Sequence, residues 1–119
     1  MLSEQKAIEI GTRWIEWWNN CTVDEYLTQY SEDIVLISSI ALRILPDSNG
    51  RIFDKKVLKE YWELVRIRFP NYKFEIERIS HFENKVLVFY HTLDKQTKAI
   101  AILTVYPDGM IYKVEVSYV

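Results

Sequence analysis

The first part of the chain repeats its apolar residues at the spacing of an α-helix. In residues 3–20 these positions fall three and four apart on one wide stripe, which predicts an amphipathic helix with Ser3 as its N-cap. Thr22 and Glu25 then have the spacing of a capping box, in which each side chain bonds the backbone amide of the other residue. A second, short helix is therefore expected directly after the first.

A third helix is predicted over residues 54–69. Its apolar positions again fall three and four apart, and Asp54 can cap its first turn. Pro70 ends this helix, because proline donates no amide hydrogen and disfavours the helical conformation of the residue before it.

The other predicted elements are strands. Residues 34–37 are apolar without a break and mostly β-branched, which is typical of a strand covered on both faces. We expect this strand to continue, less clearly, to Leu45. The alternation of the next strand slips at Arg78, which indicates a β-bulge. The four strands after the third helix are expected over residues 72–82, 86–93, 97–106 and 110–118.

The order of elements is typical of an α+β domain in which three N-terminal helices pack on a bent, mainly antiparallel sheet. Strands 86–93 and 97–106 are apolar on both faces, so the face that the helices leave open also needs cover. We therefore expect a homodimer through the outer face of the sheet. A helix-covered, curved sheet also tends to enclose a ligand pocket.

Composition and charge narrow the class of protein. With 119 residues, the chain is the size of one domain, and we expect residues 1–119 to form it. A net charge of −2 without a basic block offers no electrostatic footprint for nucleic acid. Neither a targeting peptide nor a membrane span is expected, because the apolar runs are short and the N-terminus carries acidic residues. These features, with a single cysteine, favour a cytoplasmic protein.

Several aromatic residues are candidates for the wall of a pocket that takes a small apolar ligand. They are Trp14, Trp17, Tyr30 and Trp62, although packing in the core is the commoner role of such side chains. Arg43 is the one charge in an otherwise apolar segment. It can meet a ligand carboxylate in the pocket or simply emerge at the edge of a strand.

Tyr90 and His91 are further pocket candidates, and only one of them can face it. A histidine is the simplest general base at neutral pH. Alternate residues of this strand point to opposite faces of the sheet. If the face that carries Leu87 packs against the helices, His91 lines the pocket. If the face that carries Val88 does so, Tyr90 lines the pocket and His91 lies at the dimer face. No carboxylate obviously orients His91, and a histidine satisfied in a core or interface is the commoner case.

No metal or cofactor is expected. The histidines and the cysteine lie far apart and show none of the usual metal-ligand spacings. The three glycines stand alone, so there is no glycine-rich loop for a phosphate.

The order and spacing of several short segments resemble the nuclear transport factor 2-like superfamily, and within it the SnoaL-like (polyketide-cyclase-like) group. The segments are Trp14–Asn20, Asp24–Leu27, Tyr30–Val35, Val57–Trp62, Phe69–Tyr72 and Asp108–Ile111. The resemblance covers nearly the whole chain. It implies a cone-shaped fold with a pocket between the helices and the bent sheet, and often a dimer.

The chain departs from the enzymes of that superfamily in its carboxylates. Those enzymes place carboxylates, or an Asp–His pair, on strands that face the pocket. Here the aspartates fall at turns and element ends, and Glu75, Glu77 and Glu115 alternate with other polar residues. No catalytic residue can therefore be carried over. The sequence favours a non-catalytic dimeric domain with an aromatic pocket for a small apolar ligand. The alternative is a small isomerase, cyclase or dehydratase that uses a pocket His or Tyr.

Overall fold

The computed structural model describes residues 2–119, which form helices and one sheet. The elements in chain order are α1 (Glu4–Asn20), α2 (Val23–Leu27), β1 (Tyr30–Ser38), α3 (Ser39–Ile44), β2 (Arg51–Ile52), α4 (Lys55–Arg68), β3 (Phe74–Phe82), β4 (Lys85–Thr92), β5 (Lys98–Val105) and β6 (Ile111–Tyr118). A single 3₁₀ turn, Pro46–Ser48, follows α3. No helix within the described part of the chain is long and apolar enough to cross a membrane.

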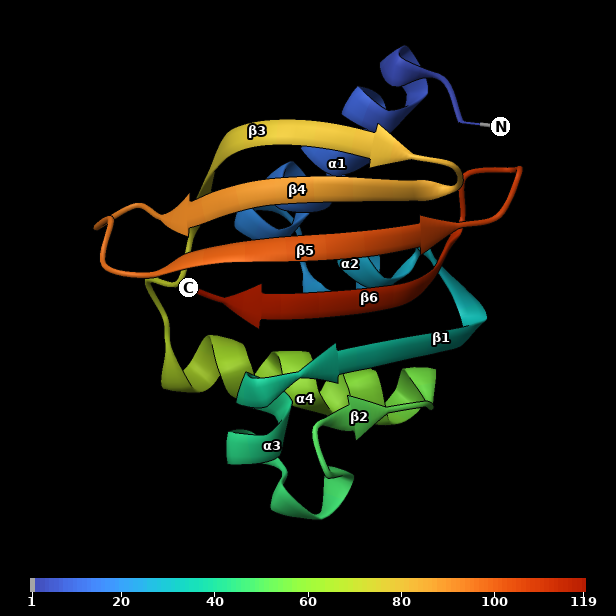
Figure 1. The fold of residues 1–119 in the computed structure, drawn as a ribbon. Helices are drawn as coiled ribbons and strands as arrows, with labels where there is room; N and C mark the ends of the chain where they lie inside the picture. The colour runs from blue at the N-terminus through green and yellow to red at the C-terminus, as the bar shows by residue number, and fades with distance from the viewer. Residues whose placement is uncertain (1) are drawn as a thin grey trace.

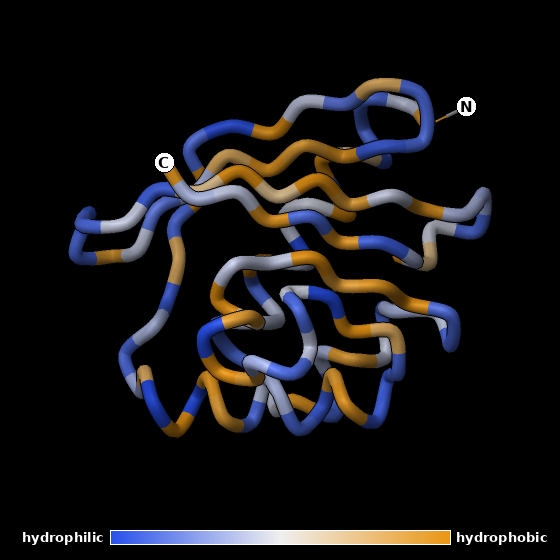
Figure 2. Tube along the Cα trace, turned by 60° about the horizontal axis from the view of Figure 1, so that its bottom comes forward, coloured by the Kyte–Doolittle hydropathy of each residue, from blue (hydrophilic) through white to orange (hydrophobic). Residues whose placement is uncertain are grey.

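The sheet has six strands in the order β2-β1-β6-β5-β4-β3. β1 runs parallel to β6, and the other neighbours are antiparallel. Figure 1 views the sheet from its outer face, with α1 and α2 behind it and α4 beside β1. Figure 2 shows hydrophobic residues gathered on the central strands and hydrophilic residues at the turns that join them. The predicted α+β class and bent, mainly antiparallel sheet are confirmed.

The predicted caps of the helices are present. Ser3 accepts a hydrogen bond from the amide of Lys6, and Asp54 accepts one from the amide of Lys56. Thr22 and Glu25 form the reciprocal capping box. These bonds satisfy amide groups that have no partner within their own helix.

The segment after residue 38 differs from its prediction. It forms the short helix α3 instead of continuing the strand to Leu45, so the fold has one helix more than expected. The reason is local. The Ser38 side chain accepts a hydrogen bond from the amide of Ile40, which starts a helical turn, and the turn buries Ala41. Arg43 therefore lies on a helix and not on a strand.

The sheet settles which side of β4 faces the helices. Val86 and Val88 are fully buried and Tyr90 is 4% exposed, whereas Leu87 and His91, on the outer face, are only half-buried. The expected bulge is present, because the register of β3 against β4 shifts between Ile76 and Arg78. Val86, Val88 and Tyr90, which share one face of β4, therefore belong to the core beneath the helices.

Candidate functional site

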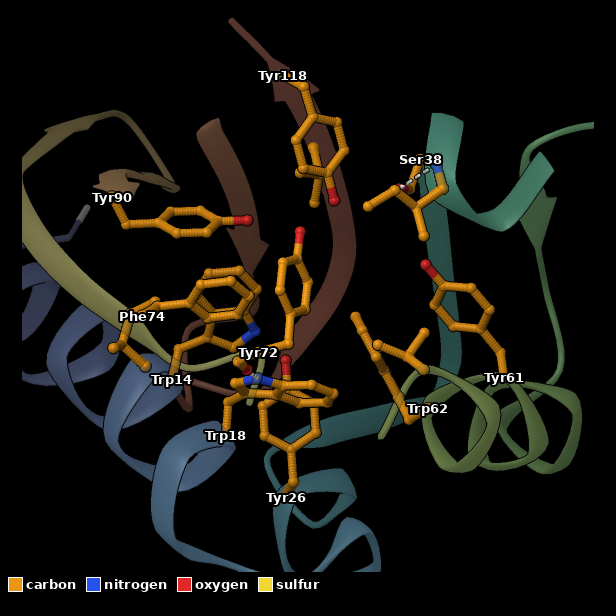
Figure 3. Close-up of a pocket in the computed structure, with 14 residues that line it drawn as sticks. Trp14, Trp18, Tyr26, Ser38, Tyr61, Trp62, Tyr72, Phe74, Tyr90 and Tyr118 are labelled. Atoms are coloured by element: carbon orange, nitrogen blue, oxygen red, sulfur yellow. Dashed lines mark hydrogen bonds between the residues drawn. The ribbon is translucent and has the colours of Figure 1, made fainter. Parts of the chain in front are cut away.

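An aromatic cavity lies between the helices and the inner face of the sheet (Figure 3). We call it the aromatic cage. Its volume is about 20 Å³, which leaves room for one or two water molecules by the usual measure. It is lined by Trp14, Ile15, Trp18, Tyr26, Ser38, Ile40, Tyr61, Trp62, Val65, Tyr72, Phe74, Tyr90, Val116 and Tyr118.

Two tryptophans of α1 form one wall of the cage. Trp14 and Trp18 lie four residues apart, so they share a face of the helix. The Nε1–H of Trp14 donates to the hydroxyl of Tyr30 at 2.8 Å, and the Nε1–H of Trp18 donates to the carbonyl of Tyr72 at 2.8 Å. Each ring is therefore held in one orientation by a hydrogen bond at its polar edge.

Arg66 of α4 fixes the end of α1 against the cage. Its guanidinium donates to the carbonyl of Cys21 at 2.6 Å and to that of Trp18 at 2.7 Å. It also lies over the Trp18 ring, 4.6 Å from the ring centre. The carbonyls at a helix C-terminus have no partner within the helix and carry partial negative charge, so a cation stabilises them. The same side chain thus joins two helices and holds one tryptophan.

The opposite wall comes from the start of β3. The Asn19 side chain donates to the carbonyl of Phe74 at 2.8 Å and accepts from its amide at 3.0 Å. This pair of bonds ties the beginning of the strand to the end of α1. Phe74, the first residue of β3, and Tyr72, two residues before it, both line the cage.

Aromatic rings from α1, α4, β3 and β4 meet around the cage. Trp14 meets Tyr90 edge to face at 5.7 Å between ring centres, and Phe74 meets Tyr90 in the same way at 4.8 Å. The rings of Trp18 and Trp62 lie 4.7 Å apart. Such arrangements each contribute about 0.5–1.5 kcal/mol beyond burial. They define the shape of the cage.

The polar atoms of the cage are mostly hydroxyls. In Figure 3 the hydroxyls of Tyr72, Tyr90 and Tyr118 point toward a common space, and that of Tyr61 points toward Ser38. Burial raises the pKa of Tyr61, Tyr90 and Tyr118, and it also raises the pKa of Tyr72. These hydroxyls are therefore protonated at neutral pH and can donate hydrogen bonds.

One buried donor beside the cage is unsatisfied. Trp62 is 9% exposed, and its Nε1–H has no hydrogen-bond partner among residues 2–119. A buried donor without a partner costs about 1–3 kcal/mol.

A second hollow opens at the mouth of the cage. This groove has a volume of about 280 Å³. It shares Ile40, Tyr72 and Tyr118 with the cage, so the two spaces are neighbours. The groove is lined by Ser39, Ile40, Arg43, Phe69, Tyr72, Thr97 and Tyr118.

The structure brings only some of the predicted pocket residues to the cage. Trp14, Trp62 and Tyr90 line it. Tyr30 lies behind the wall, where it is 1% exposed and its hydroxyl is 2.6 Å from that of Tyr26. Trp17 does not line the cage, because consecutive helical residues are turned by about 100° from each other. Its ring instead packs under the guanidinium of Arg13, at 5.5 Å.

Two further predicted residues lie outside the cage. Arg43 is exposed and borders the groove at its mouth. His91 lies on the outer face of the sheet, so it does not line the pocket. Its Nδ1 is 2.9 Å from Glu77 Oε2. Its Nε2 is 3.3 Å from Glu75 Oε1 but outside hydrogen-bond geometry. The two glutamates that the alternation placed on the polar side of β3 are thus the partners of this histidine.

Sequence reasoning did not select several residues of the cage. Trp18 has a signal in the sequence, since it lies four positions after Trp14. Phe74 lies on the inner face of β3 and Tyr72 precedes it by two residues, whereas Tyr118 lies on the face of β6 that carries Val114. Their meeting depends on the strand order, because β6 lies three strands away from β3 in the sheet.

The outer face of the sheet carries a second group of apolar side chains. Leu87 pairs with Ile102, and Phe89 pairs with Ile100. We call these four residues the outer patch, and each is half-buried. Charged residues of both signs surround it, and they are Glu75, Glu77, Arg78, Lys85, Lys98, Lys113 and Glu115. The guanidinium of Arg78 lies over the Phe89 ring at 4.1 Å.

No protein-family model matches the sequence, and no curated protein matches it. Solved structures do share its fold. A SnoaL-like protein of unknown function from Burkholderia thailandensis superposes with a TM-score of 0.89 at 21% identity, over 98% of this chain and 97% of its own. An inferred isomerase of the SnoaL-like family from Agrobacterium tumefaciens gives 0.75 at 13% identity, over 97% and 98%.

A third similar structure is an inferred SnoaL-like polyketide cyclase from Shewanella putrefaciens. It gives a TM-score of 0.71 at 12% identity, over 98% of this chain and 80% of its own. These similarities confirm the fold that the sequence segments suggested. The chain has the nuclear transport factor 2-like fold, in the form found in SnoaL-like proteins.

Proposed function

We propose that residues 1–119 form one binding domain whose aromatic cage takes a small, largely apolar ligand. The observation that carries this proposal is the lining of the cage. It consists of aromatic and aliphatic side chains with a few hydroxyls, and within the described chain no carboxylate, imidazole or amine lines it. Pockets that bind small molecules are typically apolar with a few polar groups that fix orientation.

An organic ligand needs more room than the cage offers in this structure. Tyr72 and Tyr118 are half-buried and stand between the cage and the groove, so their rotation joins the two spaces. A ligand oxygen can then also satisfy the unpaired Nε1–H of Trp62. We therefore expect binding to be coupled to movement of side chains at the mouth.

Ligand binding can be tested by tryptophan fluorescence, because Trp14, Trp18 and Trp62 line the cage. A Trp17→Phe background removes the fourth tryptophan, which does not line the cage. Small uncharged cyclic compounds should change the fluorescence in a saturable way. Val116→Trp fills the cage from β6 and should abolish the response, provided that a melting curve shows a folded protein.

The control variant is Leu64→Phe, on the exposed side of α4. It should leave binding unchanged. An absence of response across the panel, or undiminished binding by Val116→Trp, would contradict the proposal.

The second candidate function is that of an isomerase, cyclase or dehydratase. Two of the similar structures are named as an isomerase and a polyketide cyclase. The observation in its favour is Tyr90, which lines the cage and whose hydroxyl points into it. Because burial raises its pKa, this hydroxyl can donate a hydrogen bond to a developing oxyanion but is a poor base. Tyr90→Phe should then abolish turnover and preserve ligand binding.

We also propose that a second copy of this chain covers the outer patch. Its four half-buried apolar side chains are contiguous across β4 and β5. The charges around it nearly balance, so neither a strongly basic nor a strongly acidic partner is favoured, and a copy of the same face meets no large like-charge repulsion. Two-fold dimers use one such self-complementary surface.

The dimer is tested by light scattering coupled to size exclusion. Ile102→Lys places a charge at the centre of the outer patch and should yield a folded monomer. Ile67→Lys, on the exposed side of α4, is the matched control and should remain dimeric. A monomeric wild-type protein would exclude this assembly.

A further inference from the structure

We propose that the ligand is an amphipathic carboxylic acid, with its apolar body in the aromatic cage and its carboxylate at the mouth against the Arg43 guanidinium. This inference rests on the proposed function and specifies which chemical class of ligand the site selects. The observation that supports it is the position of the Arg43 side chain at the groove, next to a cage that no charged side chain lines.

The first support is the continuity of the two spaces. The groove that Arg43 borders shares Ile40, Tyr72 and Tyr118 with the cage. A molecule whose body passes between the two tyrosines therefore has its outer end in the groove. The groove, at about 280 Å³, has room for the polar end of a small acid.

The second support is the sign of the charge at the mouth. Among residues 2–119, Arg43 makes no ion pair with a carboxylate, and no acidic residue lines the cage or the groove. Burial raises the pKa of Tyr72, and the charge of Arg43 opposes that rise, so the guanidinium lies close enough to act on this tyrosine. An anion entering the groove thus meets one cation, and none of the side chains that line the groove is acidic.

The third support is the set of neutral donors near that cation. The hydroxyls of Tyr72 and Tyr118 are protonated at neutral pH, and Ser39 and Thr97 border the same groove. A planar guanidinium matches the two oxygens of a carboxylate, and hydroxyls can fill the remaining acceptor positions. One cation with neutral donors suits a monoanion, while the cage accepts only the uncharged part of the molecule.

The inference is tested with two probes of the same shape. Phenylacetate and phenylacetamide differ in charge but share the ring and the length. Isothermal titration should show that the wild-type protein binds the acid about three- to tenfold more tightly, as expected for an ion pair at a partly exposed site. Added salt should reduce this preference, because it screens exposed charges.

Substitutions at arginine positions complete the test. Arg43→Gln should bind the acid and the amide equally, and Arg43→Lys should keep part of the preference. Arg51→Gln is the matched control, because Arg51 is exposed on β2 and borders neither space. It should keep the full preference. Circular dichroism of each variant checks that it is folded.

The possible results separate the two proposals. Equal binding of acid and amide by the wild-type protein overturns the carboxylate inference and leaves the binding function standing. A preference that survives in Arg43→Gln also overturns it. If neither probe nor any uncharged compound binds, the proposed function itself fails.

Discussion

Tyr90 and His91 are neighbours on β4, but the two faces of the sheet give them opposite surroundings. The Tyr90 ring meets Trp14 and Phe74 in a space without charged groups. The His91 ring lies between two glutamates, Glu75 and Glu77, whose side chains are 61% and 36% exposed. One face is held by packing and the other carries its charges in contact with water.

The contrast shows where polar groups are costly in this fold. On the inner face the tyrosine hydroxyls are buried or half-buried beside rings, so ionising one would place a charge in a largely apolar space. On the outer face charges pair with each other and remain partly solvated, which makes each pair weak and easily replaced. We therefore expect changes on the inner face to have much larger effects than similar changes on the outer face.

The largest expected effect is unfolding at alkaline pH. Burial raises the pKa of six tyrosines above the ordinary value of 10.0, and they are Tyr26, Tyr30, Tyr61, Tyr72, Tyr90 and Tyr118. In the unfolded chain they ionise near pH 10. The folded state then binds more protons, so the stability they provide is complete below about pH 10 and is lost as the pH rises further.

Tyrosinate absorbance and circular dichroism, recorded together, check this prediction. The buried tyrosines should ionise only as the helices and strands are lost. If all eight tyrosines titrated together near pH 10 while the fold remained intact, the hydroxyls of the inner face would not be shielded from water.

The next largest effect is expected from Trp18→Ala. This change removes a buried ring, its bond to the Tyr72 carbonyl and the surface under Arg66. It should lower the free energy of unfolding by about 3–5 kcal/mol. Trp17→Ala, on the same helix, removes a half-buried ring and should cost about 1 kcal/mol. Denaturant titrations of both variants measure the difference, and equal losses would contradict the assigned positions.

A smaller effect is expected from Tyr26→Phe. It removes one partner of the 2.6 Å contact with the Tyr30 hydroxyl, which still accepts from Trp14. The loss should be about 1 kcal/mol in the free energy of unfolding, the usual value for a buried hydrogen bond. Tyr112→Phe, at a half-exposed position on β6, serves as a control for loss of a hydroxyl.

The smallest effect is expected from His91→Gln on the outer face. The change removes contacts with two exposed carboxylates, so the free energy of unfolding should fall by less than about 1 kcal/mol. A loss as large as that of Trp18→Ala would show that the histidine is part of the core and would break the comparison between the faces.

The periodic patterns were sufficient for much of this fold. The helical spacing of apolar residues predicted α1 and α4, and the alternation of apolar and polar residues predicted β3 with its bulge near Arg78. Both patterns depend only on residues that are near each other in the sequence. The parity of β4 could not be decided, since Val86 and Leu87 are both apolar and only the packing of helices distinguishes them. The helix α3 was missed because its start depends on one side-chain bond at Ser38.

The candidate site was less predictable than the fold. Trp14, Trp62 and Tyr90, three of the residues proposed from the sequence, line the cage, although the apolar pattern of β4 left Tyr90 and His91 as alternatives. Tyr118 and Tyr72 reach the same space from distant parts of the sequence. Their convergence follows from β6 passing between β1 and β5, a long-range pairing that no local pattern specifies.

The bonds between Asn19 and Phe74 also have a consequence for how this chain avoids self-association. β3 is an edge strand, and an edge exposes amides and carbonyls on which another chain can add a strand. At Phe74 both groups are occupied by one side-chain amide from the end of α1. A foreign strand therefore finds its first pairing position already taken, and a single asparagine protects the beginning of the edge against aggregation.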